Sequence, residues 1–366
     1  MSRGVVSVAI IGCGRVSGHH CRSIIQTEGA ELVAVCDLDM EKAALYREQF
    51  GAKAYDNYHR MLIDNPQVDT VAIITPSGMH YEHAVEIISR YKKNVIVEKP
   101  TFMKPSQVTE VYALAEANGV RVFAVFQNRH NLAVTRVRRG LAQGELGRVR
   151  VAAVRVRWCR PQRYYDMAAW RGTFAMDGGC LTNQGIHHID LLRQLGGEVL
   201  RVSATHGTMG ADIEVEDTAA ASIEFQSGAV GALEITTAAR PIDFEASLSL
   251  VCENGLAQIG GIAVNELQIY TPDPGACARN SEDFSGNVYG NGHVKIYEDI
   301  VAFFSAGRPY PVAYGDTLET IRLLNSFYVA HETRSWVNVA SAGDSIRLGR
   351  ADDALADLYR TPDING

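Results

Sequence analysis

The feature that most constrains the fold is an alternation of short apolar runs and longer amphipathic segments over residues 1–127. The apolar runs are rich in valine and isoleucine on both faces, which is typical of strands buried within a parallel sheet. The segments between them repeat apolar residues at helical spacing. Five runs are predicted to be strands: "VVSVAIIG" (5–12), "ELVAVCD" (31–37), "VDTVAIITP" (68–76), "NVIVEKP" (94–100) and "RVFAVFQN" (121–128). This order predicts a doubly wound parallel sheet with helices on both faces.

The second half of the chain has a different pattern, in which longer strands are joined by tight turns. "DTAAASIEF-QSG-AVGALEITTA" (217–238) and "FEASLSLVC-ENG-LAQIGG" (244–261) are each typical of two strands around a glycine-containing turn. A largely antiparallel sheet can remain open, with helices on one face only. The segments 131–143 and 293–307 are predicted to be those helices.

The fold class is therefore predicted to be α/β in two parts: a doubly wound N-terminal domain over 1–127 and an α+β domain with an open sheet over 128–340. Residues 341–366 are predicted to form a C-terminal tail or a short final helix. The uncovered face of the second sheet needs a partner, and "VRVAAVRVRW" (149–158) places apolar residues on it. A homo-oligomer, most simply a tetramer, is the predicted assembly.

Composition excludes several classes of function. The formal net charge is −7 and no block of lysine and arginine stands out, which argues against nucleic acid or an anionic membrane as the main partner. No apolar run approaches the ~18 residues that a spanning helix needs, and the N-terminus lacks the shape of a signal peptide. The seven cysteines are odd in number and contain no CxxC pair. They are interpreted as reduced core residues, and the expected compartment is the cytoplasm.

The segment "VAIIGCGRVSG" joins the first predicted strand to the first predicted helix, the context that a dinucleotide-binding loop requires. Gly12 permits the tight turn, and Gly14 lets the backbone approach a pyrophosphate at the helix N-terminus. Ser17 replaces the third glycine of the fingerprint with another small residue. Asp37 ends the second strand, where its carboxylate would accept the ribose hydroxyls and repel a 2′-phosphate. NAD is therefore predicted rather than NADP, in a domain of Rossmann type.

Polar residues also end the next two strands, at the carboxyl edge where ligands bind such sheets. Thr75 and Ser77 follow one strand, and His80 is predicted to face the cofactor or, alternatively, to be a solvated residue in the first turn of a helix. Lys99 ends the other strand between Glu98 and a proline. It could hydrogen-bond a substrate hydroxyl or serve as a base. The alternative is a lysine that pairs with Glu98 at the strand end.

In the second half, "GGCLTNQGIHHIDLLRQLGG" carries the densest set of polar groups. If a helix begins at Asn183, then His187, Asp190 and Gln194 lie within about 60° of it on one face. Such a stripe predicts a polar cleft, because burial in an apolar environment would be costly. His188 is predicted to be a packed core residue. Adjacent histidines face different ways on a helix, so no metal site is predicted.

These segments together resemble the Gfo/Idh/MocA family of sugar-modifying oxidoreductases. The resemblance rests on "GCGRVSG", "TPSGMHYEHA", "VIVEKP" and "GGCLTNQGIHHIDLL", and it extends from residue 5 to about residue 340. It implies a Rossmann domain, an α/β domain whose open sheet forms oligomer contacts, and a cleft in which Lys99 and His187 flank the carbon that exchanges hydride. Which of the two is the base stays open. Many members have aspartate where this chain has Asn183, which puts an aspartate–histidine relay in doubt.

The resemblance also suggests further site residues. The residues expected to contact the cofactor are Gly12, Gly14, Arg15, Val16, Asp37, Thr75, Ser77, His80, Glu98, Lys99, Gln127, Trp170 and Arg171. Lys99, Asn183 and His187 are the expected catalytic and substrate-binding groups. Arg163, Tyr164 and Tyr165 are further candidates for an anionic substrate, although Arg163 could equally be a solvated loop residue.

Within the family, "RYYDMAAWRGTFAMDGGCLTNQGIHHIDLL" is similar to UDP-N-acetylglucosamine-uronate 3-dehydrogenases of surface-polysaccharide biosynthesis. The resemblance implies NAD-dependent oxidation of the 3-hydroxyl of a UDP-sugar acid. A substrate that brings its own carboxylate would gain from the loss of a nearby fixed anion, which is a physical reason for Asn183. The alternatives are an inositol or free-sugar dehydrogenase and a non-catalytic NAD-binding regulatory protein.

Overall fold

The computed structural model describes residues 4–284 and 289–364, and the chain divides into two compact units. The first unit comprises Met1–Val125, His293–Leu318 and Ala351–Gly366, and the second comprises Phe126–Gly292 and Glu319–Arg350. The first boundary lies within two residues of the predicted one. The predicted division nevertheless differs at two places, because 293–318 and most of the expected tail group with the N-terminal unit.

The first unit is built on a six-stranded sheet in the order β3-β2-β1-β4-β5-β6, in which every neighbouring pair is parallel. Its strands are β1 (Val6–Ile11), β2 (Ala30–Cys36), β3 (Lys53–Tyr55), β4 (Thr70–Ile73), β5 (Asn94–Val97) and β6 (Val122–Ala124). The predicted doubly wound sheet is confirmed. The sequence missed β3, a three-residue edge strand with little apolar content to reveal it.

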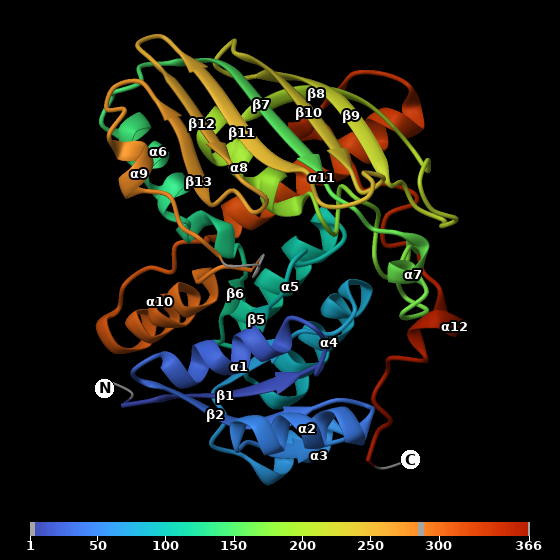
Figure 1. Cartoon of the computed structure of the whole chain (residues 1–366). Coiled ribbons are helices and arrows are strands. Elements are labelled where there is room, and N and C mark those ends of the chain that lie inside the picture. Colours follow the sequence, from blue (N-terminus) through green and yellow to red (C-terminus); the bar gives the residue numbers. More distant parts are fainter. Residues whose placement is uncertain (1–3, 285–288, 365–366) are drawn as a thin grey trace. The chain divides into compact units, whose positions relative to one another are not determined.

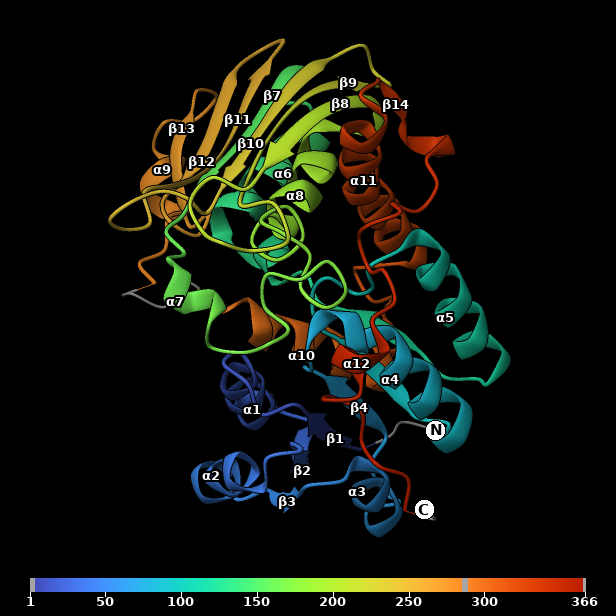
Figure 2. The same ribbon diagram turned by 90° about the vertical axis from the view of Figure 1, so that its right-hand side faces the viewer.

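Helices of the first unit lie on both faces of this sheet, and Figure 2 shows α1 and α2 on one side with α3 and α4 on the other. The helical segments are α1 (Ser17–Gln26), α2 (Met40–Phe50), α3 (Tyr58–Asp64), η1 (Ser77–Met79), α4 (His80–Glu86), η2 (Ile87–Tyr91), α5 (Pro105–Ala117), α10 (Gly292–Ala306) and α12 (Asp353–Ala356). Each segment that joins two parallel strands must cross over the sheet, which accounts for the helix between most of them.

Helix α10 belongs to the core of the first unit, so the prediction that it covers the second sheet is wrong. Ile296, Tyr297 and Ile300 are buried in one cluster with Ile10 of β1 and Ile24 of α1. An apolar helical stripe shows that a helix is buried on one side, but it carries no information about which sheet it packs on. The tertiary structure decided this point.

The second unit is built on an eight-stranded sheet in the order β13-β12-β11-β7-β10-β9-β8-β14. Its strands are β7 (Val149–Arg157), β8 (Val199–Gly207), β9 (Thr218–Phe225), β10 (Val230–Thr236), β11 (Glu245–Cys252), β12 (Leu256–Gly260), β13 (Glu266–Tyr270) and β14 (Val337–Asn338). Both predicted hairpins form, as β9–β10 and β11–β12. All pairs are antiparallel except β7–β10, which confirms a largely antiparallel sheet.

One face of the second sheet carries α6, α8 and α11, as Figures 1 and 2 both show. The helical segments of this unit are η3 (Gln127–His130), α6 (Leu132–Ala142), α7 (Gln162–Tyr165), α8 (Ile186–Gly196), α9 (Ala276–Arg279), α11 (Tyr314–Thr333, from Glu319 onward) and η4 (Val339–Ser341). No helix among the described residues is both long and apolar enough to cross a membrane.

The opposite face of the second sheet presents side chains in rows that run across the strands. One row is apolar and solvent-exposed, and it consists of Leu256, Val251, Val151 and Val230. The next row is small: Ser249, Ala153, Ala232 and Ser222. A third region carries paired charges, in which Arg155 and Arg157 bond to Glu234 and Glu245. The charges on this face are therefore largely paired with one another.

Candidate active site

The glycine loop between β1 and α1 has the geometry of a dinucleotide-binding turn. Gly12 has φ of 91°, and a Cβ there would lie 2.4 Å from the carbonyl oxygen of Ile74, so no other residue fits. The Ser17 hydroxyl donates to the Gly12 carbonyl at 2.6 Å and accepts from the Gly14 N–H at 3.1 Å. Ser17 thus closes the loop with its side chain, where the fingerprint has a third glycine. Arg15 and Val16 form the turn before α1.

Asp37 lies directly beyond β2 and is bonded to this loop. Its Oδ2 accepts from the Cys13 N–H at 2.8 Å, and its Oδ1 accepts from the Asp39 N–H at 3.0 Å. The carboxylate is therefore held beside the glycine turn, as binding of an adenosine ribose requires. A helix N-terminus beside a fixed carboxylate combines a positive dipole end with an acceptor, a set that fits NAD.

His80 is buried and clamps the backbone at this edge of the sheet. Its exposed fraction is 1%, which contradicts the alternative of a solvated histidine. Its ring nitrogens lie 2.8 Å from the Pro100 carbonyl and 3.0 Å from the Thr75 carbonyl. Burial lowers the pKa of His80. A neutral ring carries a single N–H, which donates to the nearer carbonyl, that of Pro100, and nearby Ser77 is buried as well. Cofactor contacts by Thr75, Ser77 and His80 stay predictions.

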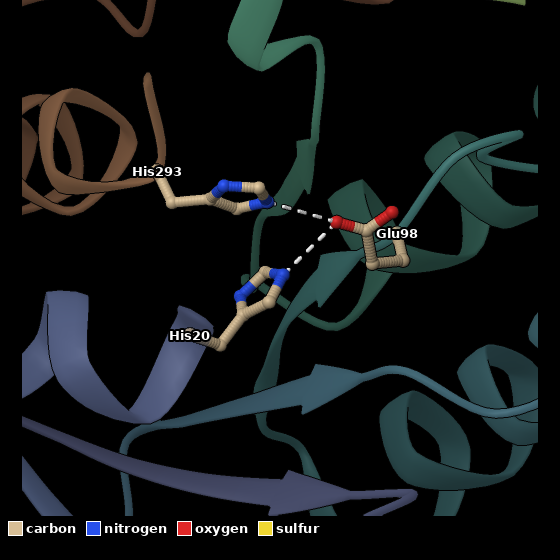
Figure 3. A group of neighbouring side chains, drawn as sticks. All are labelled: His20, Glu98 and His293. Carbon is tan, nitrogen blue, oxygen red and sulfur yellow. Dashed lines mark hydrogen bonds and ion pairs between the residues drawn. The ribbon is translucent and has the colours of Figure 1, made fainter. Parts of the chain in front are cut away.

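Glu98 is a buried carboxylate held by two histidines from distant parts of the first unit (Figure 3). Its Oε1 lies 2.9 Å from His20 Nε2 in α1 and 3.3 Å from His293 Nε2 in α10. Its Oε2 accepts from the Lys99 N–H at 2.8 Å. The Tyr297 hydroxyl lies 2.8 Å from His20 Nδ1. Sequence reasoning missed His20, Tyr297 and His293, because nothing in the pattern connects residues so far apart.

The protonation of this cluster follows from its geometry. Burial on its own raises the pKa of Glu98, but the hydrogen bonds from His20 and His293 outweigh it and hold the pKa well below its ordinary value. Burial lowers the pKa of His20, so this ring is neutral near pH 7. A neutral His20 that donates from Nε2 to Glu98 and accepts from Tyr297 at Nδ1 satisfies every contact.

His20, Glu98 and His293 are also residue types that ligate zinc, and their ligand atoms lie within 4.8 Å of one another. The two nitrogen–oxygen distances are those of hydrogen bonds, and a proton on each Nε2 leaves no lone pair there for a metal ion. The cluster is therefore assigned as a hydrogen-bonded triad. The prediction that the protein carries no metal is tested below by chelation.

The half-buried Lys99 is thus held at a fixed position in the backbone. The Glu98 carboxylate accepts its N–H, and His80 bonds to the carbonyl of the following residue, Pro100. The neighbouring residues, Glu98 and Pro100, make the hydrogen bonds that hold the backbone in place. The direction of the Lys99 side chain is set by this fixed backbone. This arrangement suits a group that must meet a reacting atom within a few tenths of an ångström.

In the second unit, α8 begins at Ile186, so the predicted start at Asn183 is wrong. Asn183 lies in a turn before the helix, where its amide donates to the carboxylate of Asp177. The other oxygen of Asp177 accepts from the Gly172 N–H at 2.8 Å. Glycines 178, 179 and 185 favour a turn over a helix here, and the sequence offered that signal. A fixed carboxylate is therefore present behind Asn183, supplied by Asp177.

The polar stripe predicted on α8 does not all face a cleft. Asp190 is 1% exposed and forms a bidentate ion pair with Arg129, in which two guanidinium nitrogens lie 2.8 and 2.6 Å from the carboxylate oxygens. Thr320 of α11 donates to it at 2.9 Å. His188 is buried edge-on to Trp158, and burial lowers its pKa to about 4, which confirms the predicted core histidine. His187 is the second residue of α8, and its ring lies edge-on to that of Phe126 with the two ring centres 6.3 Å apart.

Tyr164, Trp170 and Arg171 form an aromatic–cationic cluster in the second unit. The Arg171 guanidinium lies 4.4 Å from the Tyr164 ring centre and 4.6 Å from the Trp170 ring centre. Gln184 Nε2 donates to the Tyr164 hydroxyl at 3.4 Å, which joins this cluster to the loop before α8. A cation held between aromatic faces is well placed to bind an anion or a planar ring.

The other predicted residues of this region are less uniform. Tyr165 is buried, and its hydroxyl lies 3.0 Å from that of Thr237, so its polar end is directed into the unit. Arg163 is exposed on α7. Gln127 opens η3 and is buried, and among the described residues its side-chain oxygen has no hydrogen-bond partner. Such an oxygen is consistent with the predicted contact to a ligand.

Comparison with known families agrees with these features. The model of an oxidoreductase family with an NAD-binding Rossmann fold matches residues 6–126. The model of the GFO/IDH/MocA C-terminal domain matches residues 134–258. The chain belongs to the Gfo/Idh/MocA oxidoreductase family. This oxidoreductase is an NAD-dependent sugar dehydrogenase, and its cofactor is NAD.

Among solved structures, the oxidoreductase is similar to the WlbA dehydrogenase from Bordetella pertussis in complex with NADH and UDP-GlcNAcA. The two are 30% identical, with a TM-score of 0.86 over 92% of this chain and 99% of that chain. D-glucoside 3-dehydrogenase from Escherichia coli is 30% identical over 65% of this chain and 72% of its own length. Myo-inositol 2-dehydrogenase from Thermotoga maritima is 25% identical over 62% and 67%.

Replacement of Asp37 by alanine should weaken NADH binding by about 10-fold or more and narrow the preference over NADPH. The variant loses hydrogen bonds to a charged acceptor, each worth about 1.5–3 kcal/mol, and it loses the repulsion of a 2′-phosphate. Fluorescence titration with both cofactors measures the effect. Asp39→Ala is the control, because Asp39 caps α2 beside the loop. Equal affinity of the unaltered protein for NADPH would contradict the NAD assignment.

Replacement of Glu98 by glutamine should destabilise the oxidoreductase by about 1.5–3 kcal/mol near pH 7. Since folding lowers the pKa of Glu98, its contribution is present above the unfolded pKa near 4.5 and is lost as the pH falls further. The difference between the two proteins should therefore shrink toward pH 3 in urea unfolding curves. EDTA should change neither curve. A stabilisation by zinc that His293→Ala abolishes would instead show a metal site.

Proposed function

We propose that this oxidoreductase oxidises the 3-hydroxyl of UDP-N-acetylglucosamine-uronate with NAD, producing the 3-keto sugar for surface-polysaccharide biosynthesis. The observation that carries the proposal is the similarity of 92% of the chain to a dehydrogenase solved with NADH and UDP-GlcNAcA. The resemblance of residues 163–192 to enzymes of this branch supports it. A location in the cytoplasm is part of the proposal, and the seven cysteines are free thiols.

The cluster around Arg171 supports an anionic, ring-containing substrate. Tyr164, Trp170 and Arg171 combine two aromatic faces with a guanidinium, and this combination can bind a carboxylate, a phosphate or a nicotinamide ring. Asn183 presents a neutral amide where many relatives have aspartate. Because Asp177 lies behind it and is 2% exposed, the nearby negative charge is screened by the Asn183 amide and the Gly172 N–H. This arrangement lowers the repulsion that a substrate carboxylate would meet.

In the proposed reaction, NAD supplies the hydride acceptor. Lys99 and His187 act on the reacting hydroxyl, one as a hydrogen-bond donor and one as the base that accepts its proton. The substrate carbon loses its hydride as the O–H proton leaves, so the product is a ketone and the released proton stays on the base. The Lys99 N–H donates to the Glu98 carboxylate, and His80 bonds to the Pro100 carbonyl, so the backbone around Lys99 is held in place. His187 lies in the first turn of α8. Asn183 and Arg163 are proposed to contact the substrate.

Two other functions remain as alternatives. An inositol or free-sugar dehydrogenase is supported by the similarity to myo-inositol 2-dehydrogenase and D-glucoside 3-dehydrogenase, and it would share the cofactor site. A non-catalytic NAD-binding regulator is disfavoured because such a protein has no need for Lys99 and His187. The proposed function is tested by incubating the enzyme with NAD and a panel of UDP-N-acetylglucosamine-uronate, UDP-N-acetylglucosamine, glucose and myo-inositol. Preference for a neutral free sugar would refute the uronate assignment.

Replacement of Lys99 by methionine should preserve NADH binding and lower kcat by about 10²–10⁴, the usual range for general acid–base catalysis. Methionine keeps the length and packing of the side chain and removes only its charge and donors. Stopped-flow turnover and NADH fluorescence measure the two quantities. Lys295→Met on the exposed surface of α10 is the control. An unchanged kcat in the Lys99 variant would show that the lysine has no part in the chemistry.

The enzyme should be a homo-oligomer, most simply a tetramer, formed through the open face of the second sheet. The apolar row with Val151 and Val230 and the small row with Ala232 offer a surface that sheet-on-sheet contact can bury. Light scattering at micromolar concentration should give a multiple of 40.0 kDa. Ala232→Arg should lower that mass, whereas Leu45→Arg on exposed α2 should not. A monomeric unaltered protein would refute the proposal.

A further inference from the structure

Glu216 is a buried acid of the second unit that the proposed reaction does not use. It is 2% exposed and lies two residues before β9. Its Oε1 accepts from the Tyr328 hydroxyl of α11 at 2.8 Å and from the Leu181 N–H at 3.1 Å. Leu181 belongs to the segment that leads to Asn183 and α8. Glu216 therefore contacts the candidate active site through the backbone of the segment before Asn183.

The segment 179–182 is attached to Glu216 and Tyr328 at four successive residues. The Cys180 N–H donates to the Glu216 backbone carbonyl at 2.9 Å. The Tyr328 hydroxyl accepts from the Gly179 N–H at 3.2 Å and lies 2.7 Å from the Thr182 hydroxyl. A Cβ on Gly179 would lie 2.1 Å from the Glu216 carboxyl carbon, so the backbone at Gly179 packs against the Glu216 carboxyl group. These contacts hold the turn that precedes Asn183.

The second carboxyl oxygen of Glu216, Oε2, is buried and has no hydrogen-bond partner among the described residues. Burial raises the pKa of Glu216 to about 7, and the charge of Asp177 adds to this effect against the hydrogen bonds from Tyr328 and Leu181. An ionised oxygen without a donor is far more costly to bury than a neutral one. The acid is therefore neutral below pH 7 and ionises above it.

Three other titratable groups around Glu216 are uncharged near neutral pH. Burial raises the pKa values of Tyr328 and Cys180 well above their ordinary values, so both are neutral. His206 packs edge-on to Tyr328 at 5.4 Å, and burial lowers its pKa to about 3. The Asp217 carboxylate accepts three backbone N–H groups, from residues 209–211. Asp177 remains as the nearby charge that disfavours ionisation of Glu216.

Ionisation of Glu216 has a structural consequence, because a buried anionic oxygen must recruit a donor. Water is the available donor, and the backbone at Gly179 lies directly over the carboxyl group. A water molecule that approaches Oε2 from this side displaces the segment at Gly179. The same movement would strain the hydrogen bonds at Leu181 and Thr182, two and one residues before Asn183.

We propose that Glu216 is a positioning residue of the dehydrogenase, which in its neutral form holds the segment 179–183 on Tyr328 and so places Asn183 and the start of α8. The effect on turnover rests on the proposed function, whereas the effect on the segment does not. Glutamine at position 216 keeps the shape and the neutral charge, and it cannot ionise.

The first experiment needs no substrate. Hydrogen exchange of the peptide over 172–185 is measured at pH 6 and pH 8, with correction for the intrinsic exchange rates. One pH unit above a pKa of about 7, roughly one-tenth of Glu216 is neutral, so protection in the unaltered protein should fall about tenfold. Glu216→Gln should keep its protection at both pH values. Glu48→Gln, on the exposed surface of α2, should behave as the unaltered protein does. Equal pH dependence in the first two proteins overturns the proposal.

The second experiment measures kcat and the KM for UDP-N-acetylglucosamine-uronate from pH 6 to pH 8.5 with saturating NAD. The ratio of kcat in Glu216→Gln to kcat in the unaltered enzyme should rise about thirtyfold over this range, because only about 3% of Glu216 is neutral at pH 8.5, and the Kd for NADH should be unchanged. A constant ratio overturns the positioning role. Tyr328→Phe removes the hydroxyl that joins Glu216 to the segment, and it should lower both protection and kcat. If the unaltered enzyme fails to turn over this sugar, the proposed substrate is wrong, and hydrogen exchange still decides the role of Glu216.

Discussion

The hydrogen bonds that hold the buried carboxylate of Glu98 are the interaction on which the first unit depends. A carboxylate withdrawn from water must be met by donors, and here the donors come from α1, from α10 and from the backbone of the next residue. Glu98 therefore joins three segments that are distant in the sequence. It also fixes the backbone of Lys99, because one of its oxygens bonds to the lysine N–H. Two charged residues therefore follow β5 for different reasons: Glu98 holds the backbone in place, and Lys99 is left to direct its side chain.

In the second unit, too, buried acids are paired, hydrogen-bonded or protonated. Asp190 is paired with Arg129, the Asp177 carboxylate accepts hydrogen bonds from the Asn183 amide and the Gly172 N–H, and Glu216 is protonated below about pH 7. Asp177 and Glu216 are hydrogen-bonded to the segment that leads to His187, and Asp190 lies three residues after His187 on α8. Buried acids with few alternative partners make a turn rigid, since any movement leaves a charge or a polar atom unsatisfied. Rigidity of this kind suits a site that must orient a sugar hydroxyl.

Much of the fold could be predicted because it depends on local patterns. Five of the six parallel strands, both hairpins, the glycine loop and the core position of His188 were predicted correctly. The start of α8 was misplaced at Asn183, although three glycines in the preceding segment argued for a turn. Asp190 was assigned to a cleft because the helical stripe shows only which residues share a face. Its ion pair with Arg129 depends on a contact across 61 residues.

The sequence by itself determined five of the six parallel strands and their order along the chain, the carboxyl edge at which Thr75 and Lys99 lie, and the loop between the first strand and helix. These features follow from periodicity and from turn residues that act over a few positions. Only the tertiary structure placed α10 in the first unit, brought His20 and His293 to Glu98, and set Glu216 and Tyr328 beneath the turn at Gly179. The reason is physical: hydrogen bonds between buried polar groups join residues far apart in the chain, and their donors and acceptors show no periodic pattern.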